Sequence, residues 1–341
     1  MKALVYHGPN DLRYEDIETP KPGPGDLLIA VKAVGICGSD VHGYQGITGR
    51  RTPPMVMGHE FSGVVAEVGS EVSKVSVGQR VAIQPFLFCG ECEPCKRRDT
   101  NKCKEGRLLG VLSTNGAMAE YVVVPEKHAF PLADDVSFEE GALVEAAAVA
   151  LRAINRLQME RLPEKVAIVG VGTIGLLLMQ YARLRGAKEV LVTDLQNDRL
   201  ALAREMGADL AVNPKEEDLA KIVDEWTGGE GVPLTIEAVG ATPTVQQGMS
   251  MTAPGGTVLW VGNSQRFVEV NMQQTVTEEL RIIGTFIYSH DEFGQAVEDI
   301  GAGRVSVKKL VSATYPLAEG PEVFAALAAG TNKSLRAVLT L

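Results

Sequence analysis

The sequence predicts an α/β protein in which a β-rich unit is followed by a doubly wound parallel sheet. With 341 residues, the chain is longer than one hydrophobic core usually serves. Its first third alternates short apolar segments with Gly and Pro, as strands joined by turns do. From about Pro163 onward, strand-like segments alternate with helical ones, and a glycine-rich turn joins the first such strand to its helix. Two domains of different architecture are therefore expected.

The β-rich unit is assigned to residues 1–150. Its clearest candidate strands share alternating apolar residues and are bounded by turn residues: 27–34, 62–68, 80–84 and 119–124. Short strands of this kind are typical of an all-β or barrel-like unit.

The parallel sheet is assigned to residues 151–286. Six apolar segments are its candidate strands: 165–169, 189–193, 210–212, 234–237, 257–261 and 282–286. The clearest helices between them are 175–185 and 197–206. Since six strands complete such a sheet near residue 285, we expect the tail, residues 287–341, to return to the first unit. It contains a candidate helix at 294–301 and a candidate strand at 335–341.

Charge and hydropathy exclude several functional classes. A net charge of −10 argues against nucleic-acid binding, which normally requires a basic surface. The first residues contain no apolar segment of the kind found in signal peptides. The longest apolar stretch, 141–153, is interrupted by Glu145 and Arg152 and is too short to span a membrane. We therefore expect a cytoplasmic protein, in which clustered cysteines more often bind metal than form disulfides.

Four of the five cysteines form such a cluster. Cys89, Cys92, Cys95 and Cys103 follow the spacing C-x2-C-x2-C-x7-C. Four thiolates on one short lobe can surround a single zinc ion and leave no position open, which predicts a structural site. The alternative is a set of unrelated thiols or a pair of disulfides.

The fifth cysteine, Cys37, precedes a segment that carries His59 and Glu60. A thiolate, an imidazole and a carboxylate from separate segments can hold a second zinc and leave one position for water or substrate. Taken singly, each residue has an ordinary structural explanation: a buried thiol, a turn imidazole or a strand end. Together, beside a four-cysteine lobe, they predict a catalytic metal site.

The segment KVAIVGVGTIG predicts a dinucleotide site. It follows an apolar strand and opens a helix, so its glycines have a mechanism: a tight turn, close approach of the backbone to the pyrophosphate, and close helix–sheet packing. The candidate contacts are Gly170, Gly172, Thr173, Ile174 and Gly175. Asp194 ends the next strand, 19 residues after Gly175, where a carboxylate binds the ribose hydroxyls of NAD and repels the 2′-phosphate of NADP. Asp194 could instead cap a helix, and the nearby Arg199 could host a phosphate.

These motifs, G-I-C-G-S-D-V-H, G-H-E-F-S-G and the four-cysteine lobe, resemble the zinc-containing medium-chain dehydrogenases, and the polyol (sorbitol-type) branch is the most similar. The similarity extends over essentially the whole chain, including TDLQNDRLALAREMGAD. The resemblance implies a GroES-like catalytic domain, a Rossmann domain, two zinc ions per chain, NAD as cofactor, and a homodimer or homotetramer.

The resemblance also implies roles for single residues. Cys37, His59 and Glu60 would ligate the catalytic zinc, with Glu145 as an alternate or water-mediated ligand. Ser39 and His42 would relay the alcohol proton to solvent. Arg199 would lie against the adenine side of the cofactor. The ends of two later strands would line the nicotinamide: Ala238, Val239, Gly240, Val261 and Gly262.

The expected reaction is transfer of a hydride from a secondary alcohol or polyol to NAD, giving a ketone. Two other substrates are open: L-threonine, and a sugar-alcohol phosphate of the galactitol 1-phosphate kind, for which Arg50 and Arg51 are candidate phosphate contacts. Ile287 occupies the place of an arginine in sorbitol-type enzymes, which argues against ordinary sorbitol specificity. A different class is a non-catalytic nucleotide-binding relative, against which the sequence retains Cys37, Ser39, His59 and Asp194. A zinc-free quinone reductase of the same superfamily would be expected to lack both cysteine sets.

Overall fold

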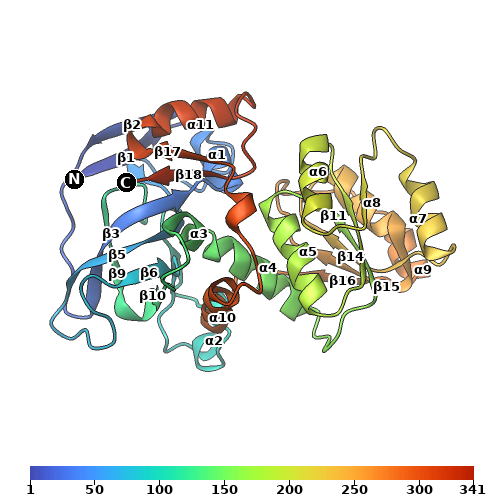
Figure 1. Cartoon of the computed structure of the whole chain (residues 1–341), viewed down its shortest axis with the longest axis horizontal. Coiled ribbons are helices and arrows are strands. Elements are labelled where there is room, and N and C mark those ends of the chain that lie inside the picture. Colours follow the sequence, from blue (N-terminus) through green and yellow to red (C-terminus); the bar gives the residue numbers. More distant parts are fainter. The chain divides into compact units, whose positions relative to one another are not determined.

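The computed structural model describes all residues from Met1 to Leu341 and divides them into two compact units (Figure 1). The first comprises Met1–Ala148 together with Tyr288–Leu341, and the second comprises Val149–Ile287. The sequence analysis placed the corresponding boundaries after residues 150 and 286.

The first unit is built around a seven-stranded sheet in the order β10-β6-β5-β3-β18-β17, with β9 also paired to β3. Its strands are β3 (Asp26–Gly35), β5 (Glu60–Val68), β6 (Arg80–Ile83), β9 (Tyr121–Pro125), β10 (Ala129–Pro131), β17 (Ala313–Pro316) and β18 (Ala337–Thr340). A smaller sheet in the order β2-β1-β4 contains β1 (Lys2–Gly8), β2 (Asp11–Asp16) and β4 (Met55–Val56). A two-stranded antiparallel sheet pairs β7 (Phe86–Leu87) with β8 (Arg107–Leu108), and the cysteine-rich lobe is the connection between them.

Strand β3 organises this sheet because it pairs with three neighbours, β5, β9 and β18. Its sequence, DLLIAVKAVG, is apolar enough to be buried on both faces, and Leu27, Ile29 and Val34 are fully buried. The tail strand β18 runs antiparallel to the end of β3, with Leu339 opposite Val34. The last residues of the chain therefore help to fix the end of β3.

Short helices occupy the connections of this unit. They are α1 (Gly38–Tyr44), α2 (Glu93–Lys96), α3 (Phe138–Ala142), α10 (His290–Gly301) and α11 (Gly320–Ala328), with 3-10 turns at Thr100–Lys102, Glu126–His128, Lys308–Leu310 and Leu317–Glu319. Helix α4 (Val144–Arg156) begins in the first unit and ends in the second. The sequence analysis treated this alanine-rich segment only as an apolar stretch, although alanine is the strongest helix former.

The second unit is a six-stranded, wholly parallel sheet in the order β13-β12-β11-β14-β15-β16. Its strands are β11 (Lys165–Val169), β12 (Glu189–Thr193), β13 (Leu210–Val212), β14 (Val232–Glu237), β15 (Thr252–Trp260) and β16 (Arg281–Gly284). Its further helices are α5 (Thr173–Leu184), α6 (Asn197–Glu205), α7 (Leu219–Thr227), α8 (Thr242–Met251) and α9 (Met272–Thr277). This strand order is that of a dinucleotide-binding sheet, and it confirms the predicted fold class.

One predicted boundary in this sheet is wrong. The sequence analysis began the fifth strand at Thr257, after Pro254, Gly255 and Gly256, residue types that weaken or interrupt strands. In the structure β15 begins at Thr252 and passes through these residues, and its pairing with β14 shifts register between Val232 and Leu234. An irregular strand absorbs the proline and the glycines.

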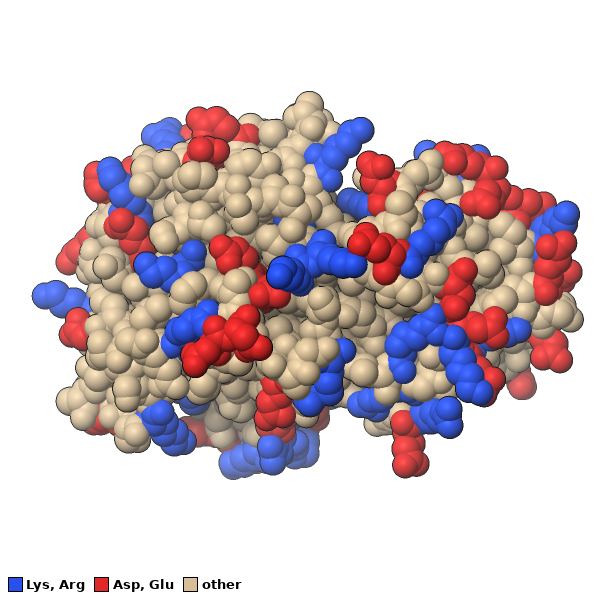
Figure 2. Space-filling model, in the orientation of Figure 1, with Lys and Arg blue, Asp and Glu red and all other residues tan.

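The surface is mixed in charge. Figure 2 shows Lys and Arg interspersed with Asp and Glu on the face it presents, with no extended basic area. None of the helices is both long and apolar enough to cross a membrane.

A buried aromatic cluster lies beside the cysteine-rich lobe. The ring of His128 packs 5.0 Å from that of Phe88, and the ring of His290 lies 5.2 Å from Phe88. His128 is fully buried, and neither of its ring nitrogens has a hydrogen-bond partner. Burial, reinforced by the nearby Lys127 and His290, lowers the pKa of His128 to about 3. This imidazole therefore stays neutral in the folded protein.

The buried His128 predicts a loss of stability in acid. Below pH about 6.5 the unfolded chain takes up a proton at this residue that the folded chain does not, so the free energy of unfolding falls by about 1.4 kcal/mol per pH unit. His128→Leu should make this slope shallower in urea titrations at pH 7, 6 and 5. Other acid-sensitive groups act on both proteins, so the difference between the two slopes isolates His128. Identical slopes would contradict the prediction.

Candidate active site

Cys37 lies two residues after the end of β3 and is the N-cap residue of α1. Its backbone is extended, with φ −75° and ψ 151°, which ends the strand direction before the helix starts. Its backbone N–H donates to Oδ2 of Asp40, the third residue of the helix, at 3.2 Å. The local sequence C-G-S-D thus fixes the position of the thiol at a helix N-terminus.

Glu60 is the first residue of the neighbouring strand, β5, and His59 directly precedes that strand. Glu60 is paired with Gly35 across the β3–β5 ladder. A Cβ at Gly35 would lie only 2.6 Å from Oε2 of Glu60, so glycine at this position makes room for the carboxylate. The possible ligand atoms of Cys37, His59 and Glu60 all lie within 4.8 Å of one another, and we call these three residues the Cys37 cluster.

Asp40 lies against His59 of the cluster, and Arg51 in turn is hydrogen-bonded to Asp40. Asp40 is fully buried, accepts a hydrogen bond from Nη2 of Arg51 at 2.9 Å, and has Oδ1 3.4 Å from Nδ1 of His59. That last contact is electrostatic, because it lacks hydrogen-bond geometry. Burial raises the pKa of Asp40, but the opposing effects of His59 and Arg51 are larger and lower it to about 2. A permanent carboxylate therefore faces the Nδ1 side of His59.

Glu60 is paired with an arginine from the tail of the chain. Nη1 of Arg336 donates to both carboxylate oxygens of Glu60, at 2.8 and 3.0 Å, and to the backbone oxygen of Ile36 at 3.0 Å. Both side chains of the ion pair are buried. Arg336 directly precedes β18, so the pairing of that strand with β3 delivers the guanidinium to the site.

Glu145, the second residue of α4, is buried in the same unit. Burial, assisted by the negative charge of Glu60, raises the pKa of Glu145 to about 7, while His59, Tyr288 and Arg336 oppose the rise. Glu145 in turn adds to the effect of burial on the fully buried Tyr288, whose pKa is raised well above its ordinary value. Glu145 is therefore electrostatically coupled to the Cys37 cluster, although it lies outside the group of three closely spaced ligand atoms.

The remaining predicted residues of this region lie close in sequence to the cluster. Ser39 and His42 are both on α1, Ser39 exposed and His42 partly buried, and neither side chain forms a hydrogen bond in the structure. The proton relay stays a prediction. The buried Arg51 side chain donates to Asp40, whereas Arg50 is exposed.

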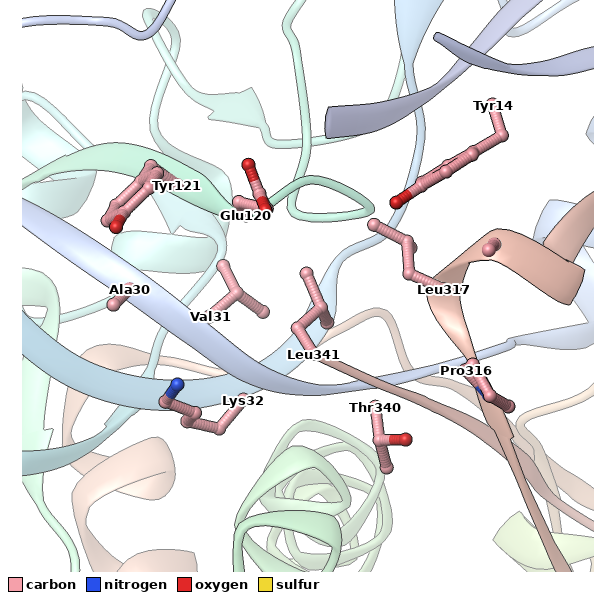
Figure 3. Close-up of a pocket in the computed structure, with 11 residues that line it drawn as sticks. Tyr14, Ala30, Val31, Lys32, Glu120, Tyr121, Pro316, Leu317, Thr340 and Leu341 are labelled. Atoms are coloured by element: carbon pink, nitrogen blue, oxygen red, sulfur yellow. The ribbon is translucent and has the colours of Figure 1, made fainter. Parts of the chain in front are cut away.

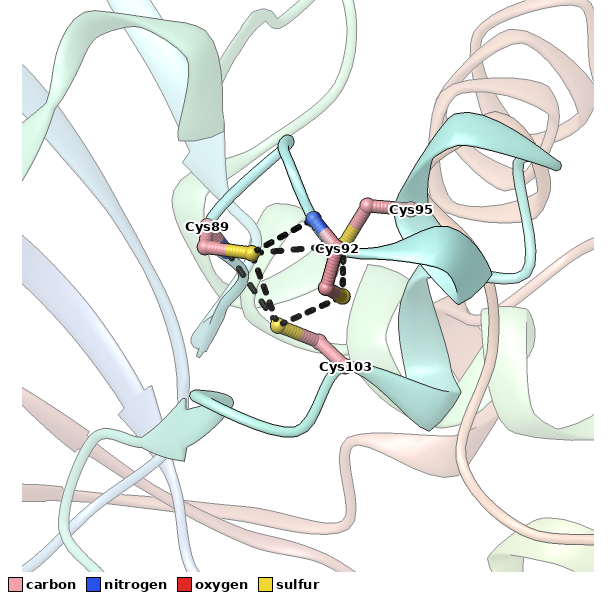
Figure 4. Close-up of side chains that lie close together, drawn as sticks. All are labelled: Cys89, Cys92, Cys95 and Cys103. Carbon is pink, nitrogen blue, oxygen red and sulfur yellow. Dashed lines mark hydrogen bonds between the residues drawn. The ribbon is translucent and has the colours of Figure 1, made fainter.

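The four-cysteine lobe has the dimensions of a zinc site (Figure 4). The sulfur atoms of Cys92 and Cys95 are 3.4 Å apart, those of Cys89 and Cys103 are 3.5 Å apart, and two further pairs are 3.9 Å apart. A tetrahedron with Zn–S bonds of 2.3 Å has edges of about 3.8 Å. All four cysteines are free thiols, which contradicts the alternative of two disulfides. The donor set fits a structural zinc.

The Cys37 cluster also fits a zinc ion. It offers one sulfur, one imidazole nitrogen and one carboxylate oxygen, three donors of the kinds that zinc prefers. The fully buried Asp40 beside His59 is the partner that commonly orients a histidine ligand.

In the parallel sheet, the glycine-rich turn has the predicted geometry. Gly170 has φ +89°, and a Cβ at Gly175 would lie 1.9 Å from the backbone oxygen of Gly170, so both positions require glycine. Gly172 is the N-cap of α5 and has open space where a side chain would be. Thr173 and Ile174 form the first turn of α5. The turn therefore presents an uncovered helix N-terminus of the kind that binds phosphate groups.

Asp194 directly follows the neighbouring strand, β12, and is hydrogen-bonded to this turn. Its Oδ2 accepts the N–H of Val171 and its Oδ1 accepts the N–H of Gln196, each at 3.0 Å. Arg199 lies 3.7 Å from the same carboxylate. The N-cap of α6 is Gln196, so Asp194 is not itself the helix cap. The other predicted contacts follow the ends of β14 and β15: Ala238, Val239, Gly240, Val261 and Gly262.

A separate surface pocket of about 330 Å³ lies in the β-rich unit, lined by residues that include Tyr14, Val31, Tyr121 and Leu341 (Figure 3). None of the predicted site residues lines it, and it contains neither a cysteine nor a histidine. It is not the candidate active site.

Three supporting residues were missed by the sequence analysis: Asp40, Arg336 and Tyr288. Asp40 lies between the noted Ser39 and His42, but its burial and its contacts with His59 and Arg51 depend on the tertiary fold. Arg336 is separated from Glu60 by 276 positions, so no local pattern indicated it.

Two family models match the chain. The alcohol dehydrogenase GroES-like domain matches residues 23–134, and the zinc-binding dehydrogenase domain matches residues 173–302. The sorbitol dehydrogenase of Ovis aries is 37% identical over 94% of this chain and 92% of its own. The D-arabitol-phosphate dehydrogenase of Enterococcus avium is 35% identical over 95% and 93%, respectively.

Solved structures agree with these matches. A zinc-binding dehydrogenase from Sinorhizobium meliloti 1021, bound to NADP, has a TM-score of 0.90 and 33% identity and covers 100% of this chain and 99% of its own. An alcohol dehydrogenase from Escherichia coli CFT073, complexed with NADH, has a TM-score of 0.90 and 30% identity with the same coverage. Similar folds therefore carry either nicotinamide cofactor.

The buried Glu60–Arg336 pair predicts a large effect on stability. Arg336→Met leaves the Glu60 carboxylate buried without its cation, and we expect the free energy of unfolding to fall by about 3 kcal/mol. The double variant Glu60→Gln/Arg336→Met removes the stranded charge and should recover most of this loss. Urea denaturation measures both, on proteins from which mild chelation has removed metal from the Cys37 cluster but not from the four-cysteine lobe, because zinc bound by Glu60 would itself balance the carboxylate. A double variant as unstable as Arg336→Met alone would contradict this account of the pair.

Proposed function

The chain belongs to the zinc-binding alcohol dehydrogenase family with a GroES-like domain, and from that premise we propose that it oxidises a polyol to a ketone with NAD, using the Cys37 cluster as its catalytic zinc site. The single observation that supports this most is the convergence of a thiol, an imidazole and a carboxylate within 4.8 Å in a chain that also carries a four-cysteine lobe.

In the proposed site, Cys37, His59 and Glu60 hold the zinc, and Glu145 serves as an alternate or water-mediated ligand. Zinc bound there would supply Lewis-acid chemistry that lowers the pKa of an alcohol hydroxyl, and NAD would accept the hydride. Asp40 orients His59, and Arg336 restrains Glu60. Ser39 and His42 are the proposed route for the alcohol proton to solvent.

For the substrate, we propose a hydroxyl-rich secondary alcohol. The names of the relatives include a sorbitol dehydrogenase and a D-arabitol-phosphate dehydrogenase, so both free and phosphorylated sugar alcohols are candidates. The contact of the buried Arg51 with Asp40 supports an unphosphorylated polyol, because it engages one of the two candidate phosphate contacts. L-threonine is the other substrate to be tested.

For the cofactor, we propose NAD rather than NADP. The carboxylate of Asp194 is held beside the glycine-rich turn by two backbone N–H groups, which is where it would bind a ribose diol and repel a 2′-phosphate. Arg199 lies against Asp194 and is thereby engaged with a carboxylate. We also propose a cytoplasmic homodimer or homotetramer.

The proposal predicts zinc-dependent turnover. The substrate panel is sorbitol, xylitol, butanediol, threonine and galactitol 1-phosphate, each assayed with NAD. Absorbance at 340 nm should rise for at least one polyol. With NADP in place of NAD, the rate of this rise should be lower or zero. Cys37→Ser should abolish this signal and leave the thermal unfolding temperature nearly unchanged, because it removes a ligand of an open site.

The matched control is the same substitution in the lobe. Cys95→Ser opens a closed four-thiolate site, so it should lower thermal stability and the zinc content by one ion per chain. Full activity of Cys37→Ser would contradict the proposed catalytic site. Bound zinc and NAD without turnover on any substrate would favour a nucleotide-binding protein instead.

A further inference from the structure

Glu237 is a fully buried acidic residue in the parallel sheet, and the proposed reaction does not use it. It is the last residue of β14, where it is paired with Val169 at the end of β11 on one side and with Trp260 at the end of β15 on the other. Glu237 therefore lies at the carboxyl edge of the sheet, next to the β11–β14 boundary where the strand order reverses. Dinucleotides bind at this position in open α/β sheets.

The side chain of Glu237 turns back on its own loop. Its Oε1 accepts hydrogen bonds from the backbone N–H groups of Val239 at 2.9 Å and Gly240 at 2.7 Å. Its backbone oxygen accepts the N–H groups of Val261 at 2.9 Å and Gly262 at 3.1 Å. One residue thus fixes the loops that follow both β14 and β15.

These loops are packed too closely to move independently. A Cβ at Gly262 would lie 2.1 Å from the backbone nitrogen of Gly240, so the two loops touch through their backbones. Val239 in turn reaches the glycine-rich turn, because a Cβ at Gly170 would lie 2.3 Å from Cγ2 of Val239. By fixing the 238–240 loop, the hydrogen bonds of Glu237 therefore also constrain the two loops that this loop touches, at the edge where the dinucleotide would lie.

The other carboxylate oxygen of Glu237 indicates that this residue does not serve stability alone. Oε2 is buried and has no hydrogen-bond partner. An unpaired buried carboxylate oxygen is costly, and such groups in folded proteins often serve a function.

We propose that Glu237 is a cofactor-positioning residue, which holds the 238–240 loop against Gly170 and Gly262 in the conformation that binds the nicotinamide dinucleotide. This inference rests on the proposed function, since it presupposes that the sheet binds NAD(H). Only Oε1 makes the two bonds to the loop, so the amide oxygen of a glutamine can replace it.

The test compares Glu237→Ala, Glu237→Gln and a matched control, Thr235→Val. Thr235 lies two residues earlier on the same strand and is fully buried, and its hydroxyl accepts a hydrogen bond from that of Thr252 at 2.9 Å rather than from the loop. Binding of NADH, measured by fluorescence titration of each zinc-loaded protein, gives the dissociation constant independently of turnover. Thermal unfolding measures the stability of each variant.

We expect Glu237→Ala to raise the dissociation constant of NADH by about tenfold or more, because two buried N–H groups lose their acceptor. Glu237→Gln should keep the dissociation constant of NADH within about threefold of wild type. Thr235→Val should lower thermal stability but leave the dissociation constant of NADH within the same limit. Wild-type affinity in Glu237→Ala would overturn the inference. So would a tenfold loss in Glu237→Gln, which remains informative if the alanine variant does not fold.

Failure of this inference can be separated from failure of the proposed function. If the wild-type protein binds NADH and the alanine variant binds it equally well, only the role of Glu237 is wrong. If the wild-type protein does not bind NADH, the proposed function is wrong and the inference fails with it.

Discussion

The ion pair between Glu60 and Arg336 is the interaction on which the rest of the candidate site depends. A carboxylate can be kept at the buried end of β5 only if a cation accompanies it, since burying an uncompensated charge costs several kcal/mol. That cation comes from the last segment of the chain, so the tail must return to the β-rich unit and pair with β3 before the site is complete. The same logic applies to Asp40, whose charge is balanced by Arg51 and by the imidazole of His59. Charge balance thus links the topology of the sheet to the donor set of the proposed zinc site.

The two halves of the proposed chemistry are supported in similar ways. In each unit, a buried carboxylate behind the contact residues fixes their orientation: Asp40 behind His59, and Glu237 behind the loop that contains Val239 and Gly240. In each unit a glycine permits the approach, Gly35 beside Glu60 and Gly170 beside Val239. In this proposal, the residues that would contact zinc or cofactor are only part of each site, and buried acidic residues next to them fix their positions.

Features encoded locally could be predicted from the sequence, and those set by tertiary contacts could not. The spacing of the four cysteines and the glycine-rich turn are readable because all their members lie within one short segment. The six parallel strands were readable from their apolar runs, whereas the start of β15 was not, because a register shift accommodates Pro254 and its glycines. Arg51 was one of two candidate phosphate contacts, but the buried Asp40 to which it donates a hydrogen bond is visible only in three dimensions. Arg336 had no local signal at all.

The resemblance to zinc-containing medium-chain dehydrogenases, in contrast, is confirmed by the family models and relatives over nearly the whole chain.

The central claim is that the Cys37 cluster holds a metal ion distinct from that of the four-cysteine lobe. Anomalous diffraction recorded above and below the zinc absorption edge, from crystals of the protein purified with zinc, tests this most directly. The account predicts two zinc peaks per chain, one among the four lobe sulfurs and one bonded to the sulfur of Cys37 at about 2.3 Å and to a ring nitrogen of His59 at about 2.0 Å. A single peak confined to the lobe, in crystals grown with excess zinc, would contradict it.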